Sequence, residues 1–286
     1  MIEIPSPASD LAAQQNFSAS DVLNGIVSTP SECGGAGKVW VEVDGRGDCL
    51  RFYGTIPEGS LSRPVIFLEG DAVQRIGKNN AGQTVWGVPS YYTQLSPSIM
   101  QAEAEQYAAA THRPFINLAR PGIYGSSGNH LERRRKREVD LVNAAVDRLK
   151  DRFGWDLMSL SGLSGGGHLV GALLARRTDV DCAVIASGNV AVRWRLEELG
   201  LAADVTGFTD FIDPVDDVDE VARHPPRSVV MLTDPMDAVV TASSQRVYLA
   251  ALRGAGVKVE QRCVTAPDAS HHLLRVPAIL AALASQ

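Results

Sequence analysis

Apolar and polar residues alternate near the start of the chain and then gather into short apolar runs. Residues 38–43 and 49–54 alternate with a period of two on either side of Asp44-Gly45, which predicts an antiparallel strand pair. Continuous apolar runs bounded by turn residues are typical of strands buried in a parallel sheet. Such runs occur at 64–68 and 182–186; strands with mostly apolar residues are expected at 114–119, 156–160 and 228–232, and a further strand at 257–264.

Helices are expected between these strands. They are placed at about 96–110, 131–153, 165–177 and 242–253, with a last helix from about 276. Strands that alternate with helices of this length predict an α/β fold with a mostly parallel central sheet, helices on both faces and the antiparallel pair at its start. Sheets of this kind place ligands at the carboxyl ends of their strands.

The length and composition fit one globular domain. The chain has 286 residues, of which 45% are hydrophobic, so residues 31–286 are expected to form a single α/β domain. Residues 1–30 are rich in Pro, Ser, Ala and Gln and are expected to form a loosely ordered arm. This start has neither the basic residues nor the apolar core of a signal peptide. Residues 193–227 occupy the place of a short, lid-like insertion.

The charge excludes some classes of partner. With 27 basic and 33 acidic residues the net charge is −6, which argues against a protein whose main task is to hold nucleic acid or an anionic membrane surface. No apolar run reaches the length of a membrane span, so none is expected. The oligomeric state stays open.

The four cysteines show no metal-binding spacing, and we expect no metal or organic cofactor. Cys182 and Cys263 lie in predicted strands. Cys33 and Cys49 flank the predicted strand pair and would form a disulfide if the protein matures outside the cytoplasm. Without that bond the chain is taken as cytoplasmic; with it, a periplasmic or secreted protein whose leader has been removed is expected.

A Gly-x-Ser-x-Gly pattern lies where a strand meets a helix. A serine hydroxyl is exposed for attack when the chain turns sharply at the serine, and this turn requires almost side-chain-free positions two residues before and after it. Gly162 and Gly166 satisfy that requirement around Ser164. Gly165 would begin the helix with its N–H directed at a developing oxyanion. Ser164 is therefore the candidate nucleophile.

A serine nucleophile needs an imidazole base and a carboxylate that orients the imidazole. In a sheet of this kind the order along the chain is serine, acid, histidine. Only His271 and His272 follow the last strand; we choose His271 because it lies further from Pro277, and His272 stays open. The acid is placed at Asp237, in the loop after strand 228–232, with Asp234 as the alternative.

One further histidine lies close to the nucleophile in sequence. His168 follows Ser164 by four residues on the same predicted helix, but the order of the triad excludes it as the base. It is interpreted as a packed, hydrogen-bonded residue.

Together these residues resemble the α/β-hydrolase superfamily, in its single-domain esterase and prolyl-oligopeptidase-like branch. The resemblance covers about residues 38–286 and implies that Asp237 is the acid. The family's second oxyanion donor follows an early strand, often in a His-Gly pair; here Glu69-Gly70 stands in that place, and the backbone N–H of Asp71 is the candidate donor. The loop from Arg120 to Gly128 resembles the family's Arg-Gly-x-Gly-x-Ser stretch, and Tyr124 is expected near the pocket.

The resemblance and the residues predict a serine hydrolase that cleaves an ester of a small or medium acyl substrate through an acyl-enzyme. An open site without a second domain demands little of the leaving group, which favours esters. A peptidase acting on short peptides is the alternative. Thioesterase or acyltransferase chemistry, and a non-catalytic binding protein on the same fold, rank lower.

Overall fold

The computed structural model describes residues 15–56 and 63–285, which divide into two compact units. The first unit contains the described residues up to 56 together with 71–133 and 140–153. The second unit contains 63–70, 134–139 and 154–285. No helix among the described residues is both long enough and apolar enough to cross a membrane.

The first unit is built on three antiparallel strands. Strand β1 (Lys38–Val43) pairs with β2 (Arg46–Thr55), and β2 pairs in turn with β6 (Phe115–Leu118). Helix α3 (Pro97–Thr111) packs on β2 and β6; it begins with a proline, and the Ser96 side chain accepts a hydrogen bond from the N–H of Ile99. The predicted antiparallel pair near the start of the chain is confirmed.

Residues 15–30 are better ordered than a loosely held arm. They include helix α1 (Ala19–Asn24), and Ile26 forms an antiparallel bridge with Gly128. The ring of Phe17 is buried, with its centroid 5.6 Å from that of Tyr92. Burial of an aromatic ring and pairing of the backbone hold this segment on the unit, which the polar composition does not reveal. Residues 1–14 of the expected arm lie outside the described residues.

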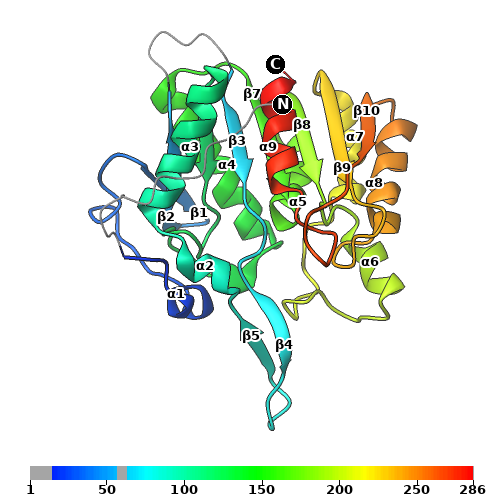
Figure 1. Ribbon diagram of the computed structural model, residues 1–286, viewed down its shortest axis with the longest axis horizontal. Coiled ribbons are helices and arrows are strands. Elements are labelled where there is room, and N and C mark those ends of the chain that lie inside the picture. Colours follow the sequence, from blue (N-terminus) through cyan, green and yellow to red (C-terminus); the bar gives the residue numbers. More distant parts are fainter. Residues whose placement is uncertain (1–14, 57–62, 286) are drawn as a thin grey trace. The chain divides into compact units, whose positions relative to one another are not determined.

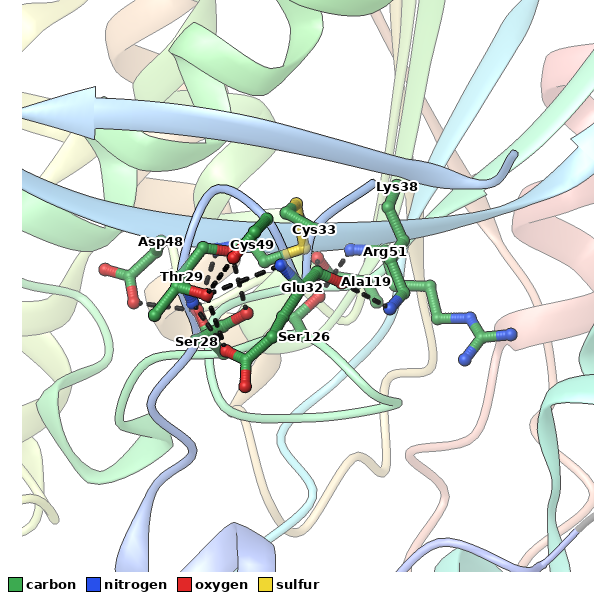
Figure 2. Close-up of a disulfide and its surroundings, with 12 residues drawn as sticks. Ser28, Thr29, Glu32, Cys33, Lys38, Asp48, Cys49, Arg51, Ala119 and Ser126 are labelled. Carbon is green, nitrogen blue, oxygen red and sulfur yellow. Dashed lines mark hydrogen bonds between the residues drawn. A yellow bond between two sulfur atoms is a disulfide. The ribbon is translucent and has the colours of Figure 1, made fainter. Parts of the chain in front are cut away.

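A disulfide joins Cys33 to Cys49, as the sequence allowed (Figure 2). The bond closes a loop across 16 residues, which stabilises a fold by roughly 3 kcal/mol in the chain-entropy model. Close by, the Ser126 hydroxyl accepts a hydrogen bond from the Arg51 N–H at 2.9 Å and donates one to the Ala119 carbonyl at 3.1 Å. The loop after β6 is thereby attached to β2.

The second unit holds the parallel part of the fold. Its strands run in the order β3-β7-β8-β9-β10, and every neighbouring pair is parallel. Both β3 and β7 are buried along their whole length, as expected for strands inside a parallel sheet. The strand bounds are Val65–Leu68 for β3, Met158–Leu163 for β7, Val180–Ala186 for β8, Ser228–Thr233 for β9 and Val259–Cys263 for β10.

Helices cover both faces of this parallel sheet. Helices α5 (Gly165–Leu174) and α9 (Arg275–Ala284) contact the same strands, β3, β7 and β8. Successive residues of a strand point to opposite faces. Ser161 donates a hydrogen bond to the Ala278 carbonyl in α9, whereas Gly162 faces the backbone of α5. The two helices therefore lie on opposite faces, and Figure 1 shows α9, in red, in front of the strands.

The remaining elements of the second unit follow β8 and β9. The expected lid-like insertion after β8 carries helices α6 and α7, separated by the short helix η2; α8 follows β9. Their bounds are Val192–Glu198 for α6, Pro214–Asp217 for η2, Val218–Arg223 for α7 and Ala242–Gly254 for α8. The mostly parallel α/β fold predicted from the sequence is confirmed.

Two parts of the chain differ from the expected elements. Helix α4 (Lys136–Phe153) begins five residues later than the pattern predicts, because Arg134 adopts a positive φ of 68° and its guanidinium is paired with Asp204 at 2.9 Å. Before it lies the short helix η1 (His130–Glu132). Strands β4 (Gln74–Lys78) and β5 (Thr84–Gly87) form a hairpin that was not expected. Helix α2 (Ser90–Gln94) follows it.

Candidate active site

The chain turns sharply at Ser164 between β7 and α5. Ser164 has φ 54° and ψ −113°, a conformation that residues with a side chain rarely adopt. A Cβ on Gly162 would lie 2.4 Å from the Gly166 carbonyl, and a Cβ on Gly166 would lie 2.0 Å from the Leu68 carbonyl. Neither position has room for a side chain. The glycine spacing thus has the steric cause expected from the sequence, and the strained turn leaves Ser164 partly exposed.

Backbone hydrogen bonds hold this turn against the next strand. The Ser164 N–H donates to the Ala186 carbonyl at the end of β8 at 2.9 Å, and the His168 N–H donates to the Ser164 carbonyl at 2.9 Å. On another side, a Cβ on Gly70 would lie 3.5 Å from the Ser164 Cβ. Ser164 therefore lies beside the end of β3 as well as the end of β8.

The acid loop after β9 carries two buried aspartates, and the structure pairs Asp237 with His272. The His272 Nδ1 lies 2.9 Å from Asp237 Oδ2 and 3.0 Å from Oδ1. The backbone N–H groups of Val239 and Val240 donate to the same carboxylate at 2.8 and 2.9 Å. The Asp237 carboxylate has no exposed surface, and 10% of the His272 side chain is exposed. This carboxylate is fixed in place and orients one imidazole.

The second aspartate of the loop pairs with the other histidine. His271 Nδ1 lies 2.9 Å from Asp234 Oδ2, and 30% of the His271 side chain is exposed. Hydrogen bonds from the backbone N–H groups of Ala266 and Met236 lower the pKa of Asp234, with a smaller contribution from His271. Through these hydrogen bonds, Asp234 connects the acid loop to the segment that carries the histidines.

The pairing of Asp237 with His271 expected from the sequence is not the one that occurs. His271 has a positive φ of 57°, so the chain turns between the two histidines and gives each ring its own carboxylate. The expected acid is thus paired with His272, the alternative that the sequence left open, and the role of either histidine as base stays a prediction.

Asp268 organises the histidine loop, and the sequence analysis did not single it out. Its carboxylate accepts hydrogen bonds from the backbone N–H groups of Ser270, His272 and Leu273 at 3.1, 3.0 and 2.7 Å, and from the Ser270 hydroxyl. Partial desolvation raises the pKa of Asp268, but these hydrogen bonds outweigh it and lower the pKa to about 2. The signal in the sequence is an aspartate two residues before a serine, a common turn pattern.

Replacing Asp268 with asparagine is expected to change the dependence of stability on pH. A carboxyl group whose pKa is lowered by folding, here from 3.8 to about 2, stabilises the fold above about pH 4, and this stabilisation disappears as the pH falls through about 2. The wild type should therefore have the higher melting temperature above about pH 4, and the gap should narrow at lower pH. Thermal melts of both proteins measure this; parallel curves from pH 7 to pH 2 would refute it.

An ion pair connects the end of β3 to the start of α9. Arg275 donates from Nε and Nη2 to Glu69 Oε1 at 2.9 and 2.7 Å, and the Glu69 side chain is 7% exposed. Glu69 precedes Gly70, which lies against Ser164, and Arg275 follows His272 by three residues. Glu69 thus attaches the loop beside Ser164 to the segment that carries the two histidines.

The remaining predicted site residues take the following places. Gly165 is the first residue of α5, and the first N–H groups of a helix have no partner within it. In the first unit, the Asp71 carboxylate accepts hydrogen bonds from Arg120 and Arg133, both at 2.8 Å. Its backbone N–H stays a prediction as an oxyanion donor. Tyr124, also in the first unit, is buried, and its carbonyl accepts a hydrogen bond from the Tyr53 hydroxyl.

His168 is buried in α5, as a packed residue should be, and its Nε2 lies 2.8 Å from the Ile212 carbonyl. This contact joins α5 to the segment between α6 and α7. Within residues 15–56 and 63–285, the structure brings no three His, Cys, Asp or Glu side chains together as ligands for a metal ion.

No protein-family model and no curated protein matches the sequence, but solved structures match the fold. An esterase of Pyrococcus furiosus is 13% identical with a TM-score of 0.55, and the match covers 92% of this chain and 91% of that one. An acylaminoacyl peptidase of Pyrococcus horikoshii is 9% identical with a TM-score of 0.54, covering 86% of this chain and 39% of that one. This chain thus spans about two fifths of the length of the peptidase. Likeness at such low identity establishes the fold alone.

Proposed function

Because the chain has the α/β-hydrolase fold, we propose that it is a serine hydrolase that cleaves carboxylic esters, with Ser164 as nucleophile, His272 as base and Asp237 as acid. The observation that carries the proposal is the buried Asp237–His272 pair in the same unit as a serine on a strained strand-to-helix turn. Asp237 holds the proton on Nδ1, which leaves Nε2 unprotonated and able to accept the serine proton.

The reaction proceeds through an acyl-enzyme. Ser164 Oγ attacks the acyl carbonyl carbon while His272 takes the hydroxyl proton, and the resulting imidazolium is stabilised by Asp237. The N–H of Gly165 stabilises the oxyanion. His272 then protonates the leaving alcohol. Water, deprotonated by the same histidine, attacks the acyl group and regenerates the serine.

His271 takes no proton in this scheme. Its bond to Asp234 fixes the loop on which His272 lies, since Asp234 also accepts hydrogen bonds from Met236 and Ala266. The Cys33–Cys49 disulfide supports an oxidising compartment as the place where the protein acts.

Turnover of p-nitrophenyl esters and of aminoacyl p-nitroanilides tests the substrate class. Esters should be hydrolysed with the higher kcat/KM, because an alcohol leaves more readily than an amine and needs less help from the site. Since the fold is shared with an acylaminoacyl peptidase, the opposite preference would favour the second candidate, a peptidase that acts on short peptides. Failure to hydrolyse either class would contradict the proposed hydrolase function.

A further inference from the structure

Exposed apolar side chains of the second unit gather on three segments. Among the described residues of this unit, the large apolar side chains that are exposed all lie on α6 and the residues just after it, on the acid loop after β9, or on the segment from the histidines into α9. These residues are Trp194, Leu199, Leu201, Met236, Val239, Leu273 and Val276. Met236 is 68% exposed and Trp194 is 48% exposed.

The three segments follow the ends of β8, β9 and β10. Because these strands are parallel neighbours, their carboxyl ends meet at one edge of the sheet. Asp237 and His272 lie on two of the segments. The apolar side chains are thus on the segments that supply the proposed acid and base.

Hydrogen bonds hold these segments together, with the acid loop between the other two. Arg195 in α6 donates from Nε and Nη2 to the Val239 carbonyl at 3.0 and 2.7 Å. On the other side, the N–H of Ala238 donates to the Ser270 carbonyl at 2.9 Å. The far end of α6 is held too, since Glu198 accepts hydrogen bonds from Thr241 and Ser243.

The beginning of α6 is fixed independently. Its first N–H groups, those of Val192 and Arg193, both donate to the buried carboxylate of Asp213 at 2.8 Å. Helix α6 is therefore anchored at both ends, and Trp194 is presented from a fixed backbone. We call four of the exposed side chains the apolar collar: Trp194, Met236, Val239 and Leu273.

Single exposed apolar residues are ordinary on protein surfaces, but several of them on segments that also carry, or are bonded to those that carry, the proposed acid and base indicate an apolar ligand. Each methylene group removed from water contributes about 0.8 kcal/mol, which corresponds to a change of about fourfold in kcat/KM. A collar of half-exposed side chains cannot bury a chain completely, so a somewhat smaller gain per methylene is expected.

We propose that the apolar collar binds the hydrocarbon chain of the substrate, so that the enzyme selects esters with longer alkyl chains over acetyl esters. This inference rests on the proposed ester hydrolase function and names its substrate class. The collar supplies the binding energy for the chain, and the Ser164, His272 and Asp237 groups act on the ester bond.

The test is a chain-length series of p-nitrophenyl acetate, butyrate and octanoate, each below its aggregation concentration. Wild-type protein should show kcat/KM rising with chain length. In Met236→Ser and Leu273→Ser the ratio of octanoate to acetate turnover should fall at least threefold for each substitution, in keeping with the loss of one or more methylene contacts. Val27→Ser, which changes a side chain that is 96% exposed in the first unit, should retain the wild-type ratio.

The outcomes separate the inference from the function on which it rests. Turnover of all three esters without a preference for chain length would contradict the proposed role of the collar but not the hydrolase function. The same ratio of octanoate to acetate turnover in every variant would do so too. No turnover of any ester, together with no labelling of Ser164 by a fluorophosphonate, would overturn both. Before these assays, thermal melts check that each variant is folded like the wild type.

Discussion

Replacing Ser164 with alanine is expected to lower kcat for p-nitrophenyl esters by roughly 10⁶-fold, the loss seen when a triad serine is removed from a serine hydrolase. Without the hydroxyl no acyl-enzyme forms, and what remains is the contribution of the oxyanion donors and of substrate binding. Steady-state rates and reaction with a fluorophosphonate measure the loss. The stability should change little, because the Ser164 side chain makes no capping hydrogen bond to α5 and the residue is partly exposed.

The matched control is Ser161→Ala, three residues earlier, in β7. Its hydroxyl donates to the Ala278 carbonyl at 3.1 Å, so its loss costs stability of about 1 kcal/mol but leaves the nucleophile in place. This variant should react with the fluorophosphonate as the wild type does. Equal labelling of wild type and Ser164→Ala would contradict the role of Ser164.

The two neighbouring histidines are expected to respond very differently to the same substitution. His272→Asn should lower kcat by a factor similar to that of Ser164→Ala, roughly 10⁶-fold, because it removes the group that accepts the serine proton. His271→Asn should lower kcat only a few fold. Asparagine tolerates the positive φ of 57° at this position, and its amide N–H₂ is placed to donate to Asp234.

A third variant removes both the hydrogen bond of His271 and the tolerance of its backbone conformation. His271→Ala has neither the donor nor an easy left-handed conformation, so it should lose more activity than His271→Asn. Its defect should lie in kcat more than in KM, since the loop positions the base rather than the substrate. If His271→Asn were the inactive variant and His272→Asn the active one, the assignment of the base would be reversed.

Much of the fold follows from local pattern. The buried strands β3, β8 and β9 are mostly apolar, and the bounds of these strands and of β7 differ from the expected ones by only a few residues. The turn at Ser164 was also predictable, because glycine spacing around a serine has a direct steric cause: side chains at Gly162 and Gly166 would collide with the backbone. Local rules succeed where one segment determines its own conformation.

The choice between the histidines could not be made in this way. Two adjacent histidines have the same local pattern, and two aspartates stand in the same loop. What separates them is a positive φ at His271 and the hydrogen bonds that Asp268 accepts from the backbone of the following residues. These depend on how the loop after β10 meets the loop after β9, a contact between residues far apart in sequence.

The early part of the chain shows the same limit. The composition predicts that Phe17 and Ile26 belong to a polar, Pro- and Ser-rich arm. In the structure, the ring of Phe17 packs on Tyr92 and the backbone of Ile26 pairs with Gly128. Neither partner is close in sequence. The disulfide between Cys33 and Cys49 was anticipated, since both cysteines flank one strand pair, yet its formation depends on the same tertiary arrangement.

The central claim is that Ser164, His272 and Asp237 form one catalytic triad. Its most direct test is the rate of reaction with a fluorophosphonate, with the adduct located by mass spectrometry, for the wild type, His271→Asn and His272→Asn. The account predicts an adduct on Ser164 that forms rapidly in the wild type and in His271→Asn and is nearly abolished in His272→Asn. An adduct on another residue, or undiminished labelling of His272→Asn, would contradict it.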